Sequence, residues 1–193
     1  NGEYAGFFDI DWHSALRPQL HDKVLLPMLG DPYGKALESG QLTLHYEGGA
    51  FSIHYFDHHF PVSPDTYDRV LRLRLDELNE KLGATSEAAI EYQSVVTAVT
   101  HLPPRTATEP ARAAERQREK EVIKHRFAGL CAASAPIRAA VEASVEQLNG
   151  TAGDPRSFDL LDALIERQTY RTGYWRAPST GEKRYTRVCF QSP

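Results

Sequence analysis

Three short polar and aromatic segments contain the residue types that could do chemistry. In the first, Asp9 and Asp11 stand beside Trp12 near the start of the chain. Two carboxylates can act as acid and base on a glycosidic bond, and an indole can stack on a sugar ring. Acidic turns of this kind are also common in loops without a catalytic role. The spacing therefore marks a candidate sugar-binding segment, and does not by itself indicate a catalytic pair.

The second segment groups His54, Asp57, His58 and His59. Histidine with aspartate can form a metal site or an acid–base pair. In a strand, however, adjacent side chains point to opposite faces, so His58 and His59 would diverge. No C-x-x-C or H-E-x-x-H motif accompanies them. We favour a structural interpretation, in which Asp57 anchors a turn and a histidine bonds to the backbone, with a metal-dependent enzyme as the open alternative.

The third segment, residues 168–176, ends in Tyr174, Trp175 and Arg176 and is expected at the end of the last helix. Aromatic faces and a guanidinium fork suit a polyhydroxylated ligand. The competing interpretation is a helix end packed on a neighbour, with an arginine capping the last carbonyls. The chain has no G-x-G-x-x-G, Walker or G-x-S-x-G motif, so no segment identifies a function alone.

Composition excludes several classes of protein. The 193 residues carry a net charge of −4, which gives no reason to expect nucleic acid or an anionic membrane as a partner. No run of residues is apolar for long enough to cross a bilayer. Cys131 and Cys189 are far apart and lack metal spacing, which favours two free thiols in a reducing cytoplasm. Because the chain begins at Asn1 instead of Met, we expect a piece of a longer protein.

The first third of the chain predicts short strands and one brief helix. Residues 23–29 form an apolar run typical of a buried strand. The Asp-Pro pair at 31–32 is a helix-start signal, and Gly40 ends that helix. Apolar residues then alternate through residues 41–56 on both sides of Gly48-Gly49, which predicts a β-hairpin.

The rest of the chain predicts helices, because the apolar positions change to helical spacing. Pro136 divides one long helical stretch, since a proline inside a helix costs about 3 kcal/mol. The polar first half of that stretch predicts a solvent-exposed helix. The expected helices run from Ser63 to Gly83, from Thr85 or Ser86 to Pro103, from Arg105 to Ser134, from Ser134 to Leu148 and from Asp154 to Gln168.

These elements predict an α+β fold that is mainly α. We expect a loop and β-hairpin lobe at residues 1–62, a helical array at residues 63–176, and a divergent tail at residues 177–193.

Four blocks of sequence, taken together, resemble the maltooligosyltrehalose synthases. The motifs of that family are F-F-D-I-D-W, K-V-L-L-P-V-L-G-x-P-Y-G, Y-Y-D-H-R-F-P and Q-A-Y-R-L-A-Y-W-R. The similar blocks here follow in the same order: Phe7–Trp12, Lys23–Gly34, Tyr55–Pro61 and Gln168–Arg176. After Arg176 the family continues close to D-E-I-N-Y-R-R-F-F-D, and this chain departs from it from about Ala177 onward.

The resemblance implies an enzyme of the α-amylase clan, glycoside hydrolase family 13, with a (β/α)₈ barrel. Such enzymes are isomerases of trehalose biosynthesis. They convert the reducing-end α-1,4 bond of a maltooligosaccharide to an α,α-1,1 bond, without a metal or cofactor in our expectation. The family's catalytic carboxylates lie C-terminal to the Y-W-R block, so none is expected within this chain.

By this resemblance the chain corresponds to a loop, hairpin and helical excursion that walls the substrate cleft. The expected partners are a maltooligosaccharide and the rest of the parent barrel, and the expected compartment is the cytoplasm. A carbohydrate-binding or helical interaction module that stands alone is the alternative. The residues expected on or near the cleft wall are Asp9, Asp11, Trp12, Asp57, His58, Tyr174, Trp175 and Arg176.

Overall fold

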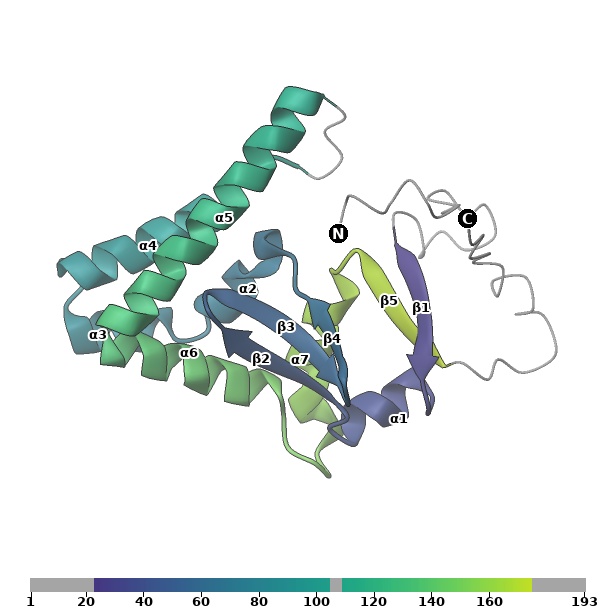
Figure 1. Ribbon diagram of the computed structural model, residues 1–193. Helices are drawn as coiled ribbons and strands as arrows, with labels where there is room; N and C mark the ends of the chain where they lie inside the picture. Colours follow the sequence, from purple (N-terminus) through teal and green to yellow (C-terminus); the bar gives the residue numbers. More distant parts are fainter. Residues whose placement is uncertain (1–22, 105–108, 175–193) are drawn as a thin grey trace. The chain divides into compact units, whose positions relative to one another are not determined.

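The protein is described by a computed structural model that covers residues 23–104 and 109–174 (Figure 1). Within these residues the chain forms two compact units, and the boundary between them falls inside helix α1 (Tyr33–Glu38). One unit contains residues 23–36 and 168–174, and the other contains residues 37–167. The expected α+β, mainly α fold is confirmed. Residues 1–22 of the expected lobe at 1–62 and the whole expected tail at 177–193 lie outside the described residues.

The first unit is built on two parallel strands, β1 (Val24–Leu29) and β5 (Tyr170–Tyr174). Val24 pairs with Tyr170, and the register shifts between Pro27 and Leu29. Proline has no N–H for a ladder hydrogen bond, which explains an irregularity at this place. Strand β1 was expected from the apolar run. The expectation that residues 168–176 end a helix is wrong for residues 170–174, which form a strand because a partner far along the chain supplies its hydrogen bonds.

The second unit contains an antiparallel sheet in the order β2-β3-β4. Its strands are β2 (Leu42–Glu47), β3 (Ala50–Tyr55) and β4 (His58–Pro61). The hairpin predicted around Gly48-Gly49 is confirmed, with Leu42 opposite Tyr55 and Glu47 opposite Ala50. Both glycines have positive φ, 54° and 83°, as the turn requires.

Helices cover the apolar face of this sheet. Phe51, on β3, packs edge-on against Tyr67 with ring centroids 4.8 Å apart, and it also contacts Phe127 of α5 (Pro110–Ala133). Tyr46 of β2 meets the same Phe127 at 5.1 Å. Phe51 and Phe127 are 1% and 0% exposed, so these rings form the centre of the core. The alternation seen in the sequence therefore corresponds to one buried face and one open face.

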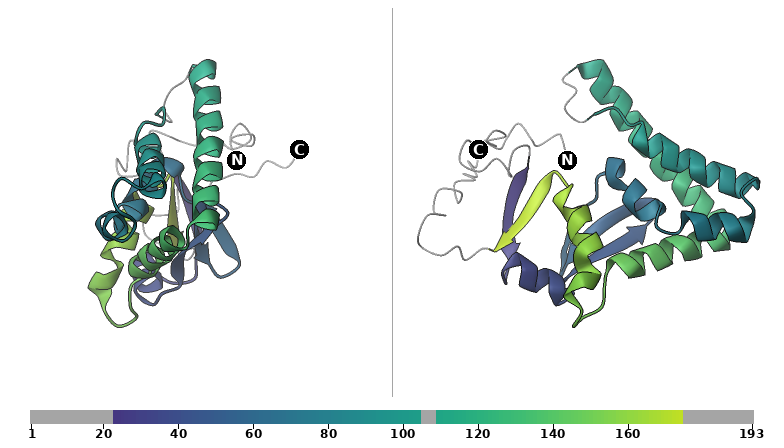
Figure 2. Two further views of the ribbon diagram at one scale, coloured as in Figure 1. Left: turned by 90° about the vertical axis from the view of Figure 1, so that its left-hand side faces the viewer. Right: turned by 180° about the vertical axis from the view of Figure 1, so that it is seen from behind.

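Most helices lie where the sequence predicts them. Helix α5 lies alongside α4 (Glu87–Thr100), and α6 (Ala135–Leu148) contacts β2 (Figures 1 and 2). The Ser86 hydroxyl accepts a hydrogen bond from Ala89 N and caps α4 as expected. Ser134 precedes the helix that carries Pro136, so the predicted division is also confirmed. The elements are η3 (Pro64–Thr66), α2 (Asp68–Leu71), α3 (Leu75–Leu82), α4 (Glu87–Thr100), α5 (Pro110–Ala133), α6 (Ala135–Leu148), η4 (Pro155–Phe158) and α7 (Asp159–Glu166).

The single helix expected from Ser63 to Gly83 is instead three short elements, η3, α2 and α3. The Tyr92 hydroxyl, on α4, donates a 2.8 Å hydrogen bond to the Leu71 carbonyl. That carbonyl would accept from Leu75 N in a continuous helix, but Leu75 N bonds to Arg72 instead. A side chain that inserts into the ladder in this way is a recognised cause of helix breaks.

Among the helices of residues 23–104 and 109–174, none combines the length and apolar character needed to span a bilayer.

Candidate functional site

The open face of the β2-β3-β4 sheet carries a stack of three histidines, His45, His54 and His59, here called the histidine ladder. The His45 and His54 rings are 3.9 Å apart at an interplanar angle of 15°. The His54 and His59 rings are 3.8 Å apart at 7°. His54 pairs directly with His59 across β3 and β4, whereas His45 is its diagonal neighbour on β2. The antiparallel register therefore brings three residues from separate strands into one column.

Two hydroxyl groups hold the ladder in place. Thr43 Oγ1 lies 3.0 Å from His45 Nε2, and Ser52 Oγ lies 2.9 Å from His54 Nε2. Each hydroxyl belongs to the same strand as its histidine, two residues away, so both point to the open face. The rings are parallel and do not converge on a point. Within the described residues, no cluster of three or more His, Cys, Asp or Glu is placed to hold a metal ion.

The pKa of His54 is lowered from its ordinary value of 6.5. The largest cause is burial, which disfavours the charged imidazolium, and the neighbouring His45 and His59 lower the pKa further. Glu47, on the same face, acts in the opposite direction and raises it. The ladder is thus stable in the form in which its central ring is neutral.

Acidification is expected to destabilise the protein through this residue. The unfolded chain binds a proton at His54 near pH 6.5, while the folded chain resists it, so stability falls as the pH drops below 6.5. We expect the melting temperature of the wild type to fall between about pH 8 and about pH 5. The variant His54→Gln should lose less over the same range. An equal loss in both proteins would contradict a role for the ladder.

The predicted residues Asp57 and His58 lie at the tip of the second hairpin of this sheet. Phe56 and Asp57 form its two-residue turn, and His58 begins β4 opposite Tyr55. The expected divergence of His58 and His59 is confirmed, because His59 joins the ladder while His58 lies on the side of Phe60. Asp57 and His58 are both exposed, side by side in the chain.

Of the other predicted site residues, the structure describes Tyr174. Tyr174 is the last residue of β5 and belongs to the first unit. The five remaining residues lie outside the described residues: Asp9, Asp11, Trp12, Trp175 and Arg176.

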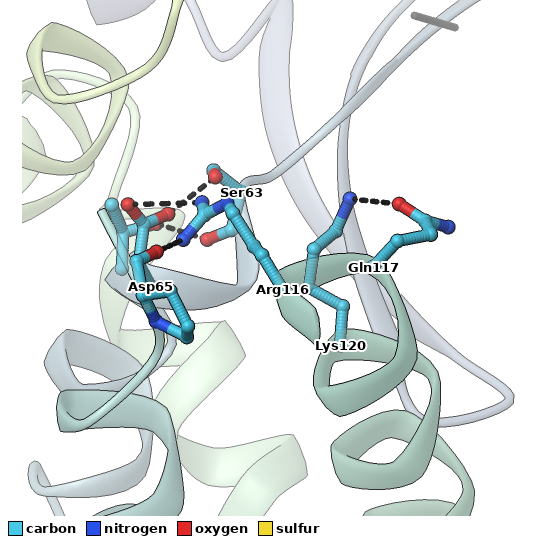
Figure 3. Close-up of polar contacts among 7 residues, drawn as sticks. Ser63, Asp65, Arg116, Gln117 and Lys120 are labelled. Carbon is cyan, nitrogen blue, oxygen red and sulfur yellow. Dashed lines mark hydrogen bonds and ion pairs between the residues drawn. The ribbon is translucent and has the colours of Figure 1, made fainter. Parts of the chain in front are cut away.

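A second polar cluster has a structural explanation (Figure 3). Arg116, on α5, donates to the Pro103 carbonyl and pairs with Asp65 of η3 at 3.4 Å. The Ser63 hydroxyl donates to the same Asp65. Lys120, one turn further along α5, donates to Gln117 at 3.0 Å. The Arg116 side chain is only 13% exposed, so these bonds satisfy its largely buried guanidinium and tie α5 to η3 and to the segment at Pro103.

Neither the surface hollow beside α5 nor the Cys131 thiol is a candidate functional site. A shallow, open hollow of about 590 Å³ lies between the Gly48 turn and α5, but its cations are already paired. Arg126 bonds to Glu91 at 2.8 Å and Lys124 to Glu121 at 3.0 Å. Cys131 is a buried free thiol whose pKa is raised, chiefly by burial, which makes it a poor nucleophile.

The sequence did not single out His45 or Phe56. A two-residue turn at Gly48-Gly49 fixes the register of β2 against β3. That register places His45 diagonally across from His54, so it was the signal that could have found the ladder. No sequence pattern indicated that Phe56 would be exposed. Comparisons with protein-family models, with curated proteins and with solved structures gave no match for this chain.

Proposed function

We propose that this chain is a segment of an enzyme of the maltooligosyltrehalose synthase type, and that it contributes walls of the cleft that holds a maltooligosaccharide. The parent enzyme would isomerise the reducing-end α-1,4 bond to an α,α-1,1 bond. The four similar sequence blocks support this proposal. The carboxylates that perform the reaction would come from the rest of the barrel.

One structural observation carries the proposal. The second and fourth blocks of the resemblance, residues 23–34 and 168–176, contain β1 and β5, which pair as parallel neighbours. In the sequence, residues 37–167 separate these two blocks and form a compact unit of their own. Parallel neighbours with a large insertion between them are the arrangement expected of an excursion from a barrel whose strands are all parallel.

The chemistry assigns this segment a positioning role. In a reaction that resembles retaining glycoside transfer, the released sugar must be held and turned while water is excluded. Effective concentration and orientation then favour the sugar hydroxyl over water as the acceptor. An exposed hairpin tip with Asp57 and His58 offers a carboxylate and an imidazole to sugar hydroxyls.

The test uses the purified chain with maltopentaose. We expect chemical-shift changes on titration with maltopentaose and none with cellopentaose, whose β-1,4 bonds give a different shape. Incubation with maltopentaose should give no trehalosyl-ended product by chromatography, because the catalytic carboxylates are not in the chain. Product formation by the chain alone would contradict this account, and a failure to bind maltopentaose would remove its role in the cleft.

A further inference from the structure

Phe56 combines an unfavourable backbone conformation with unusual exposure. It occupies the first position of the turn between β3 and β4. Its φ is 49°, and among the described residues it is the only non-glycine residue with positive φ. Bulky side chains rarely adopt this region, and glycine or asparagine usually stands at such a position. Its side chain is 72% exposed. The folded protein therefore bears a conformational cost to present an apolar ring to solvent.

The ring is supported from one side. Tyr55, which is itself 5% exposed, packs edge-on against Phe56 with centroids 4.8 Å apart at 78°. This contact lies against the Phe56 ring, and the residue remains largely exposed. The other large hydrophobic side chains that the described residues expose are aliphatic and sit on helices: Ile90, Val122 and Leu160.

The neighbours of Phe56 decide what kind of ligand suits it. Asp57 and His58 follow it directly, and both are exposed. An isolated ring among polar groups is not the broad apolar patch that protein or membrane docking requires. A pyranose, by contrast, has an apolar C–H face that can lie on an aromatic ring, and hydroxyls around its rim that can bond to a carboxylate or an imidazole.

We propose that Phe56 is a stacking platform for one glucosyl ring of an α-1,4-glucan, with Asp57 and His58 as partners for its hydroxyls. The identity of the glucan rests on the proposed function, while the platform itself rests on the strain, support and exposure of Phe56. Backbone strain of this kind is concentrated at functional positions such as ligand-binding residues, which agrees with this role for Phe56.

The experiment compares Phe56→Gly with the wild-type chain, using maltopentaose as the probe in isothermal titration. We expect at least about tenfold weaker binding, the effect of losing one aromatic contact of this kind. Glycine accepts positive φ, so the melting temperature should not fall. Phe56→Trp should bind like the wild type because it retains a flat ring. Ile90→Ala, which removes another exposed apolar side chain, should leave binding unchanged.

The outcomes separate the two proposals. If the wild type binds maltopentaose and Phe56→Gly binds equally well, the platform is refuted and the proposed function stands. If the wild type does not bind, the proposed function fails and the glucan as ligand fails with it. If Phe56→Gly instead abolishes a concentration-dependent self-association seen by sedimentation, the occupant is a second copy of the chain and this inference is wrong.

Discussion

Replacing Gly49 with alanine is expected to destabilise the protein by about 3 to 5 kcal/mol. A Cβ at this position would lie 2.1 Å from the Lys124 carbonyl oxygen and 3.0 Å from Ala128 Cβ. The obstacle is the backbone of α5, which cannot rotate away as a side chain could. Glycine is required here because the hairpin turn is pressed against the helix, and its φ of 83° adds to the cost for alanine.

Gly48 provides the matched control, because it stands next to Gly49 in the same turn. Its φ is 54°, and an added Cβ would meet nothing within 4 Å. The variant Gly48→Ala should therefore lose only about 1 kcal/mol of stability, the cost of positive φ for an alanine. Urea unfolding followed by circular dichroism measures both variants. Equal losses for the two would show that the contact with α5 does not limit this position.

Replacing Asn149 with alanine is expected to cost about 3 kcal/mol. Asn149 follows α6, and its side chain pairs with the free edge of β2. The Leu44 N–H donates to Asn149 Oδ1 at 2.6 Å, and Asn149 Nδ2 donates to the Leu44 carbonyl at 3.0 Å. Leu44 is 0% exposed, so removal of the amide leaves two backbone groups that water does not readily reach.

Asn79→Ala is the control for the loss of an asparagine amide. Asn79 accepts a 3.0 Å hydrogen bond from Gln93, a side-chain partner that can turn toward solvent when the amide is removed. We expect this change to lower the free energy of unfolding by less than about 1 kcal/mol. The free energy of unfolding from denaturant titration compares the two variants. Similar values would mean that the Leu44 backbone finds water or another partner.

Local sequence signals were sufficient to predict helix ends, a helix cap and the hairpin turn. Gly40 and Gly83 end helices with positive φ, Ser86 caps α4 with its hydroxyl, and Gly48-Gly49 turns the hairpin. In each case the residue type satisfies a backbone requirement within a few positions, so a single sequence contains the information.

Features that depend on distant partners could not be predicted. Strand β5 contains a glycine and a mixture of polar residues, and it becomes a strand because β1 pairs with it. The break between α2 and α3 follows from Tyr92, which lies on another helix. For the candidate site, the sequence placed Asp57 at a turn. The stacking of His54 and His59 required the pairing of β3 with β4, which no local pattern specifies.

The pairing of β1 with β5 has a consequence for the order of folding. The two strands are separated by residues 30–169, so joining them in an open chain would require closing a very long loop. The compaction of residues 37–167 shortens the distance that the chain must close. We therefore expect the parallel pair to form last, as a slow phase that follows the collapse of the inserted unit.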